Sequence, residues 1–405
     1  MSVFKKPVIL LLLTNIMAFG LLFFYRTPLD YNTLYIGASV MAISAVTYFV
    51  ICFFKMGDEY MFLIVSMLVT LGTLMLCRLN FEYGIKQIIW YLISVCAFYI
   101  SFFVYRYVKN LDKIGIFYYG AGAVLFIVTL AFGSVSGGAK NWIKLGFISI
   151  QPSEFIKLLF IFYLASYFSG SRDKVYFGKI PQHTAVSFAM YVYLGFLVLQ
   201  REWGISVLFF MIYIIMEYIF EHKLLLIAGN LLLAAMGGMV GYLTMYHIQV
   251  RISTWLDPWA DVAKKGYQIC QSLFAIAAGG FFGSGIGLGK PTFIPKVHTD
   301  FIFSAICEEM GMFGGAAVIM LFFIFVYRGF KISLSLEDGF DKCVAVGITV
   351  MFAIQTFIIT GGVIKLIPLT GITLPFISYG GSSLLSSFVA LGILQAVSAK
   401  ERVEK

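Results

Sequence analysis

Charged residues are scarce in this 405-residue sequence, where they make up 12% of the chain, about half the share found in soluble globular proteins. Hydrophobic residues reach 60%, which excludes a cytosolic enzyme and a disordered chain. The six cysteines form no CxxC pair, so a disulfide-rich secreted scaffold is excluded as well. The sequence also lacks both a phosphate-binding loop and a dinucleotide-binding turn, so ATP-driven work is not expected. These absences leave an integral membrane protein.

Long apolar runs are abundant, and the mean hydropathy is +0.93. Runs near 20 residues with almost no charge are typical of membrane-crossing helices, whereas the strands of a barrel alternate in polarity. The sequence therefore predicts an all-α polytopic membrane protein. The first run follows two lysines but has no small-x-small cleavage site, which favours a retained helix. Twelve spans are predicted, at 7–25, 33–54, 60–77, 87–104, 114–132, 152–169, 184–200, 203–220, 224–245, 301–327, 343–363 and 373–397.

The distribution of Lys and Arg predicts the orientation of these spans. If both termini are cytoplasmic, 16 of the 29 basic residues lie in cytoplasmic segments and seven in short outer loops, as the positive-inside rule requires. The net charge of +9 is then an insertion signal facing anionic lipid, and no nucleic-acid partner is expected. Residues 246–300 form one long outer loop, and their aromatic and glycine clusters favour a functional loop over a disordered one.

Ionisable residues inside apolar runs are costly, so each is a functional hypothesis. Glu154 and Lys157 follow Pro152 with i,i+3 spacing, which places them on one face of a helix. They form either a self-neutralising pair near the interface or part of a polar cavity, and the sequence leaves both interpretations open.

A second polar cluster, His298-Thr299-Asp300, stands at the start of an apolar run. Asp300 is either an ordinary helix N-cap or a functional carboxylate. Glu308 lies eight residues further along, about two helical turns and roughly on the same face. His298 has too few neighbouring ligands for a metal site.

A third cluster interrupts the last apolar run with proline, glycine and serine, at Pro368–Gly371 and Leu374–Ser383. Broken helices are tolerated at membrane depth only where they are buried in protein or line a cavity. Small residues such as Gly380 and Gly381 are equally common at plain helix–helix contacts.

These clusters together resemble three signatures of the SEDS family (shape, elongation, division and sporulation), which comprises FtsW, RodA and SpoVE. The first is Gly138–Trp142 with Gln151–Glu154 and Lys157, the second joins Trp255–Trp259 to His298–Phe303, and the third is Leu374–Ser383. The resemblance implies a ten-helix core at 57–400 with a large extracytoplasmic loop at 246–300. Residues 1–56 would add two N-terminal transmembrane helices, and 401–405 would form a cytoplasmic tail.

The resemblance further implies a peptidoglycan glycosyltransferase in the bacterial cytoplasmic membrane that polymerises lipid II for elongation, division or sporulation. Its expected partners are a class B penicillin-binding protein and proteins of the elongation or division complex. Because diphosphate is already a good leaving group, one general base and cationic groups are enough for an inverting displacement. Asp300 is the expected base. The expected substrate-binding or cavity residues are Glu154, Lys157, His298, Thr299, Arg251, Lys365, Ser378 and Ser382.

No cofactor is required by the sequence, although a divalent cation, Mg²⁺ or Mn²⁺, could bridge the diphosphate. Two alternatives remain open, a lipid II flippase or transporter and a non-catalytic scaffold of the cell-wall synthesis complex. A transporter predicts inverted repeats, and no internal repeat is visible in the sequence. A scaffold would not need Asp300, whereas a polymerase would.

Overall fold

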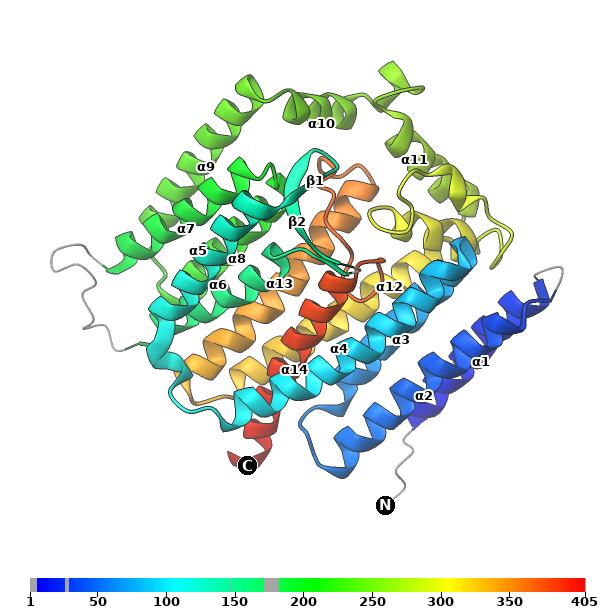
Figure 1. Ribbon diagram of the computed structural model, residues 1–405, viewed down its shortest axis with the longest axis horizontal. Coiled ribbons are helices and arrows are strands. Elements are labelled where there is room, and N and C mark those ends of the chain that lie inside the picture. Colours follow the sequence, from blue (N-terminus) through cyan, green and yellow to red (C-terminus); the bar gives the residue numbers. More distant parts are fainter. Residues whose placement is uncertain (1–5, 26–28, 147, 171–181, 405) are drawn as a thin grey trace. The chain divides into compact units, whose positions relative to one another are not determined.

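The computed structural model describes residues 6–25, 29–146, 148–170 and 182–404, and most of them are helical (Figure 1). Arg172, Lys174 and Lys179, which the orientation count places in the cytoplasm, lie outside the described residues. The chain divides into two compact units, the first comprising Met1–Arg106, Arg251–Arg328 and Gln355–Lys405 and the second Tyr107–Val250 and Gly329–Ile354. The predicted division of the sequence at residue 56 stays a prediction.

The first unit is built on long apolar helices. Its helices, four of which also include residues of the second unit, are α1 (Lys6–Tyr25), α2 (Tyr31–Phe53), α3 (Glu59–Leu79), α4 (Phe81–Tyr107), α10 (Tyr246–Leu256), α11 (Tyr267–Gly279), α12 (Ile302–Leu334), α13 (Gly339–Val363) and α14 (Gly381–Glu404). Two 3₁₀ turns, Pro258–Asp261 and Pro291–Phe293, lie in the loop before α12. Helix α11 lies between these two turns.

Helices α3 and α14 form the buried centre of the first unit, because most of their residues are hidden within the protein. The α14 side chain Gln395 donates from Nε2 to the carbonyls of Met56 (2.7 Å) and Asp58 (3.0 Å). At the other end of α14, a Cβ on Gly381 would collide with the Trp90 indole of α4. Gly381 is thus at a close helix contact, one of the two roles expected for these glycines.

The N-terminal helices α1 and α2 run side by side and pack on α3 (Figure 1). Phe19 of α1 is 2% exposed, and its side chain fills the space beside Gly37 of α2. Asp30 is the N-cap of α2, and its side chain accepts a hydrogen bond from the Asn32 amide, as N-cap aspartates usually do. The two helices are therefore an integral part of the first unit.

The second unit surrounds an aromatic core with shorter helices. Tyr193 stacks on Tyr119 with ring centroids 4.7 Å apart and meets Phe126 edge-on. The helices of this unit are α5 (Gly115–Phe132), α6 (Ser153–Phe168), α7 (Gln182–Leu199), α8 (Trp203–Phe220) and α9 (Leu224–Thr244), with a 3₁₀ turn at Leu111–Ile114.

A small antiparallel sheet departs from the all-helical expectation. Its strands are β1 (Ser134–Ser136), β2 (Ala139–Leu145) and β3 (Ile148–Ile150), in the order β1-β2-β3. Gly137 and Gly138 join the first two strands with positive φ angles of 59° and 87°. Two-residue hairpin loops need such angles, so the glycine of the first sequence signature is there to make this turn.

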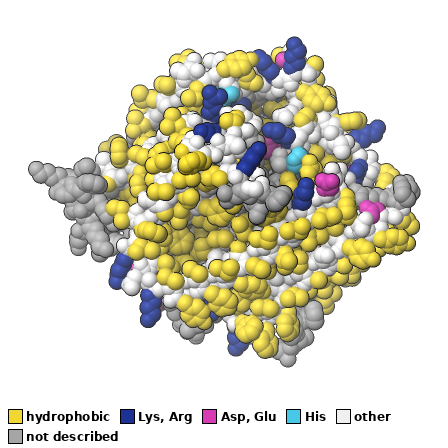
Figure 2. Space-filling view, in the orientation of Figure 1, with side chains coloured by type: hydrophobic (Ala, Val, Ile, Leu, Met, Phe, Trp, Pro, Cys, Tyr) yellow, Lys and Arg dark blue, Asp and Glu magenta, His cyan; other side chains and the backbone are white. Residues whose placement is uncertain are grey.

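Most of the predicted spans correspond to suitable helices. Among the described residues, ten helices are long and apolar enough to cross a membrane, and His183–Leu199 is a shorter apolar helix. The span predicted at 152–169 corresponds to α6, which has 16 residues. Figure 2 shows hydrophobic side chains over most of the visible surface, as expected of helices that face lipid. The chain is a multi-pass membrane protein.

Candidate active site

The predicted base, Asp300, lies in a tight turn just before α12. The amides of Thr299 and Asp300 both donate to the carbonyl of Lys296, over 3.1 and 3.2 Å. Lys296 has a positive φ of 55°, which bends the chain there. Val297, only 7% exposed, anchors the turn in the protein. Asp300 is thus presented on a short anchored loop.

The surroundings of Asp300 raise its pKa. Burial is the largest cause, while a hydrogen bond with Thr299 and the charges of Lys296 and Arg251 oppose the shift. A carboxylate with a raised pKa is a stronger base than an ordinary one. The amides of Ser304 and Ala305 donate to the carbonyl of Phe301, and the N-cap interpretation of Asp300 stays a prediction.

Arg251 and Asp300 both lie next to Gly371. A Cβ on this glycine would lie 3.6 Å from Arg251 Nη2 and 3.6 Å from Asp300 Oδ2. Arg251 Nη1 donates to the carbonyls of Leu369 (3.1 Å) and Thr370 (2.7 Å). The guanidinium is therefore held by the backbone of the third sequence cluster through Nη1. Its Nη2 lies beside Gly371, as does the Asp300 carboxylate.

Arg251 remains a cation in this position. More than a third of its surface is exposed, yet neighbouring groups remove enough water from the guanidinium to lower its pKa, and Asp300 opposes that shift. Arginine is always charged in proteins. The group thus combines one carboxylate with the cations Arg251 and Lys296.

His298 is held in an aromatic cluster. Its ring stacks on Tyr83 with centroids 4.6 Å apart and meets Tyr379 edge-on at 5.8 Å. Burial and the charge of Lys296 lower its pKa, so the imidazole is neutral at pH 7. Its backbone carbonyl accepts from the Tyr379 amide over 2.8 Å. His298 fixes the turn that carries Asp300.

Ser378 joins the second and third sequence clusters. Its hydroxyl donates to the Thr299 carbonyl over 2.6 Å and accepts from the Leu374 amide over 2.9 Å. Ser382, 2% exposed, lies in the first turn of α14. The structure therefore brings Arg251, His298, Thr299 and Ser378 to Asp300, and substrate contact by either serine stays a prediction.

Lys365 connects the ends of α13 and α10. Its Nζ donates to the carbonyl of Leu256 over 3.3 Å, and its own carbonyl accepts from Trp255 Nε1 over 3.2 Å. These bonds tie the tryptophan-rich turn of the outer loop to the chain after α13. The predicted diphosphate contact of Lys365 stays a prediction.

Glu154 and Lys157 form a buried ion pair within the second unit. Lys157 Nζ lies 2.6 Å from Glu154 Oε2, and the two side chains are 2% and 7% exposed. Both lie in the first turns of α6, after Pro152. The predicted pairing on one helical face is confirmed, while a role in a substrate cavity stays a prediction.

A second buried carboxylate of this unit, Glu202, was missed by the sequence reasoning. Its Oε1 accepts from Asn141 Nδ2 and Gln151 Nε2, each over 2.6 Å. Burial, the largest cause, raises its pKa to about 7. Asn141 and Gln151 both belong to the first sequence signature, so buried amide side chains were the available signal. In the sequence, Glu202 lies between the predicted spans 184–200 and 203–220, and nothing else there marked it as buried.

Metal binding finds little support at Asp300. Among the described residues, no three His, Cys, Asp or Glu side chains gather in a way that could hold a metal ion. A magnesium ion needs at least one or two carboxylates and substrate phosphates, whereas Asp300 is flanked by two cations. The cations suit direct binding of an anion by Arg251 and Lys296, and the divalent cation predicted at the diphosphate stays a prediction.

Comparison with known proteins places these residues in a family context. The family of cell cycle proteins FtsW, RodA and SpoVE matches residues 47–403. The peptidoglycan glycosyltransferase RodA of Mycobacterium bovis is 36% identical over 364 residues, covering 84% of this chain and 78% of that protein. The stage V sporulation protein E of Bacillus subtilis is 38% identical over 288 residues, covering 69% and 76%.

Solved structures share the same fold. The chain in a structure described as coordination of polymerization and crosslinking by a peptidoglycan synthase complex matches with a TM-score of 0.70 and 23% identity, over 85% of this chain and 98% of that one. The rod shape determining protein RodA of Thermus thermophilus matches with a TM-score of 0.62 and 22% identity, over 84% and 96%.

Proposed function

Because this chain belongs to the SEDS family of FtsW, RodA and SpoVE, we propose that it is a peptidoglycan glycosyltransferase that polymerises lipid II at the outer face of the cytoplasmic membrane. Relatives at 35% and 36% identity over most of the chain are named peptidoglycan glycosyltransferases. The observation that carries the mechanism is Asp300, a carboxylate of raised pKa in the second family signature, which lies with Arg251 beside Gly371.

The reaction needs one proton acceptor and a stable leaving group. A sugar hydroxyl of the acceptor attacks the anomeric carbon of the donor, and the C–O bond to polyprenyl diphosphate breaks with inversion. Asp300 takes the hydroxyl proton, and its raised pKa makes the carboxylate a stronger proton acceptor. The diphosphate leaves as a stabilised anion, so a second carboxylic acid is not needed.

Arg251 and Lys296 supply the positive charge for the developing diphosphate. Arg251 is fixed by two carbonyls, and such preorganised donors stabilise charge without reorganising during the reaction. Lys296 lies four residues before Asp300 and acts on it electrostatically. No step of this mechanism runs through a metal ion, and a divalent cation, if required, would arrive with the diphosphate.

The proposal extends to orientation and partners. Both termini are cytoplasmic, since the basic residues divide by side as the positive-inside rule requires, and the loop at 246–300 then faces outward with Asp300. A class B penicillin-binding protein would cross-link the strands made here. The structural neighbour in a synthase that couples polymerization and crosslinking supports such a partner, together with other proteins of the elongation or division complex.

The test is polymerisation of fluorescent lipid II by the purified chain, alone and with its transpeptidase. Wild type should form glycan strands, and Asp300→Asn should lower the rate at least about a hundredfold, as loss of a general base does. Asp257→Asn is the matched control, because Asp257 is an exposed carboxylate of the same loop that caps a 3₁₀ turn.

Other outcomes would refute this assignment. Equal strand formation by wild type and Asp300→Asn would remove Asp300 as the base. No strands from wild type, with or without transpeptidase, but translocation of lipid II in vesicles would favour a flippase. Inactivity in both assays, with the chain still binding its transpeptidase, would favour a scaffold.

A further inference from the structure

Helix α12 is broken at Gly311, whose φ of 68° and ψ of −171° are not helical. In an unbroken helix, the amides of Met312 and Phe313 would donate to carbonyls four residues earlier, those of Glu308 and Glu309. Here they donate to the carbonyls of Gly280 (2.9 Å) and Phe281 (3.3 Å) instead. The break therefore leaves two carbonyls of α12 without their helical partners.

The glycine-rich turn, which we define as residues 280–290, takes up these two carbonyls. The Ser284 amide donates to the Glu308 carbonyl over 2.9 Å, and the Gly285 amide donates to the Glu309 carbonyl over 3.0 Å. Gly311 lies nine residues into α12, about 13 Å from its start. A broken backbone at that depth needs partners from the protein, and the glycine-rich turn provides them.

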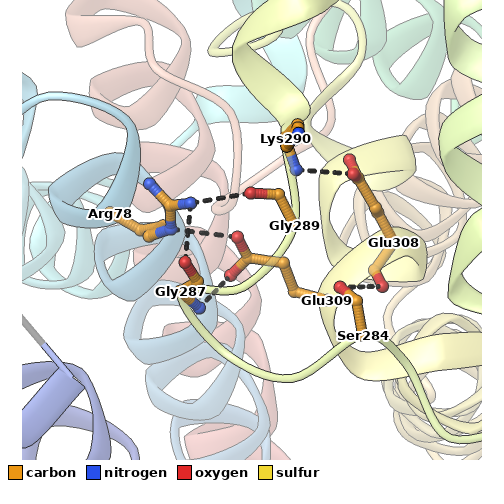
Figure 3. A network of polar contacts seen from close by, with 7 residues as sticks. All are labelled: Arg78, Ser284, Gly287, Gly289, Lys290, Glu308 and Glu309. Atoms are coloured by element: carbon orange, nitrogen blue, oxygen red, sulfur yellow. Dashed lines mark hydrogen bonds and ion pairs between the residues drawn. The ribbon is translucent and has the colours of Figure 1, made fainter.

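Side chains close the same contact, as Figure 3 shows. Arg78, in the last turn of α3, lies 3.0 Å from Glu309 Oε1 through its Nε. Its Nη2 donates to the carbonyls of Gly287 and Gly289, each over 2.9 Å. Glu309 Oε2 accepts from the Gly287 amide over 2.9 Å. One guanidinium thus holds both the turn and the broken helix.

Glu308 fixes the far end of the turn. Its Oε1 accepts from the Lys290 amide over 2.6 Å, while its backbone carbonyl also accepts from Ser284 Oγ over 3.0 Å (Figure 3). The sequence placed Glu308 and Asp300 on one helical face. The structure instead commits the Glu308 carboxylate to the glycine-rich turn, since α12 begins only at Ile302.

The N-terminal helix pair covers the apolar side of the turn. Ile286 packs against a buried cluster formed by Ala18, Phe19, Leu22, Ile36, Leu74 and Cys77. A Cβ on Gly287 would lie 2.9 Å from the ring of Tyr25 at the end of α1. The family match begins at residue 47, so α1 and most of α2 lie outside it.

We propose that Arg78, Glu309 and the N-terminal helix pair form a clamp that positions residues 291–300, the loop that carries Asp300. The clamp holds the glycine-rich turn, and ten residues after Lys290 the chain reaches Asp300. Ile294, 2% exposed, and Val297 pack the segment between the turn and Asp300 into the protein. Because this segment is short and packed, it cannot lengthen to absorb a displacement of the turn, and a displaced turn would shift these residues and the carboxylate. Arg78 and Phe19 are positioning residues. The inference rests on the proposed role of Asp300.

The experiment uses the full chain in lipid nanodiscs and measures amide hydrogen exchange across 280–290 together with kcat and KM for lipid II. Arg78→Lys keeps the charge but cannot bond Glu309 and two carbonyls as a planar fork. We expect exchange at Gly287 and Lys290 to rise about tenfold to a hundredfold, the loss typical of hydrogen bonds to charged groups. The value of kcat should fall about tenfold with KM within about a factor of two, because the perturbation misplaces the base and leaves binding intact.

Phe19→Ala should show the same pattern from the apolar side of the clamp. Its matched control is Phe24→Ala, since Phe24 lies on the same helix and is 76% exposed. Lys86→Ala is the control for charge, because Lys86 forms a solvent-exposed pair with Glu82 at 3.5 Å. Both controls should match wild type in exchange and kcat.

Unchanged exchange across 280–290 in folded Arg78→Lys would overturn the clamp. Faster exchange with wild-type kcat would overturn its link to Asp300. If Arg78→Lys fails to fold, Ile286→Ala carries the same test, because it removes only apolar contact. A wild-type chain that does not polymerise lipid II would refute the proposed function, whereas its exchange rates would still decide whether the clamp exists.

Discussion

Removing the positive charge of Arg251 should make Asp300 a stronger base that ionises at higher pH. Arg251 Nη2 and Asp300 Oδ2 each lie 3.6 Å from the same point beside Gly371, so they are at most about 7 Å apart. An opposite charge at that distance favours the ionised carboxylate. In Arg251→Ala this favourable charge is absent, and the pKa of Asp300, already raised by burial, should rise further.

The size of this rise follows from Coulomb's law. Two unit charges about 7 Å apart interact by roughly 0.6 kcal/mol at the dielectric constant of water and roughly 2.4 kcal/mol at an effective value of about 20. More than a third of Arg251 is exposed, so solvent screening favours the lower half of that range. The expected rise is about 0.5 to 1 pKa unit.

The assay is the pH dependence of kcat/KM for lipid II polymerisation, whose acid limb reports the pKa of the base in the free enzyme. The acid limb should move to higher pH by about 0.5 to 1 unit in Arg251→Ala, and added salt should reduce the difference. Arg251→Lys keeps the charge and should leave the limb near that of wild type. Lys264→Ala, an exposed cation of the same outer loop, is the control.

An acid limb that stays in place, or that moves to lower pH, would refute the reasoning. Either result would mean that the carboxylate whose titration sets the acid limb does not interact electrostatically with Arg251. If the acid limb moves equally in Lys264→Ala, the shift comes from the net positive charge of the loop. The specific interaction of Arg251 with Asp300 beside Gly371 would then be wrong.

Two further predictions concern the buried carboxylates of the second unit. The pKa of Glu202 is raised from 4.5 to about 7 in the folded chain. Wild type should therefore lose about 3 kcal/mol of stability as pH rises through that interval. Glu202→Gln should abolish this pH dependence, as measured by thermal unfolding from pH 4.5 to 8. Lys157→Met leaves Glu154 buried without the partner now 2.6 Å away and should destabilise the chain by about 3–5 kcal/mol. The double variant Glu154→Gln/Lys157→Met should recover most of that loss, and an unaltered melting temperature in Lys157→Met alone would contradict the expectation.

The sequence predicted most of the fold because a bilayer demands long apolar helices. Spans such as 60–77 and 203–220 correspond to α3 and α8 within a few residues. The exceptions are local. The hairpin at 134–145 was not predicted, because strands of three to seven residues carry too few positions for a period-two pattern. The first sequence signature singled out the glycines and amide side chains of this region, but it did not predict the sheet.

The site was recovered in part, and for a definite reason. Asp300, His298 and Thr299 are neighbours in sequence, so one motif presents them together. Arg251, in contrast, reaches Asp300 only because the chain at Leu369 and Thr370 captures its guanidinium. Lys365 and Arg251 looked alike as outer cations, and the structure separates them, since Lys365 contacts the end of α10 instead.

The sequence by itself determined that this chain crosses a membrane many times and that few ionisable groups lie within its apolar segments, and it predicted that the basic residues divide by side. Those properties depend on composition and local periodicity, which a single chain carries in linear order. Only the tertiary structure decided which of these groups meet. The capture of Arg78 by a turn more than 200 residues away depends on the break at Gly311, whose freed carbonyls and amides must find partners within the protein.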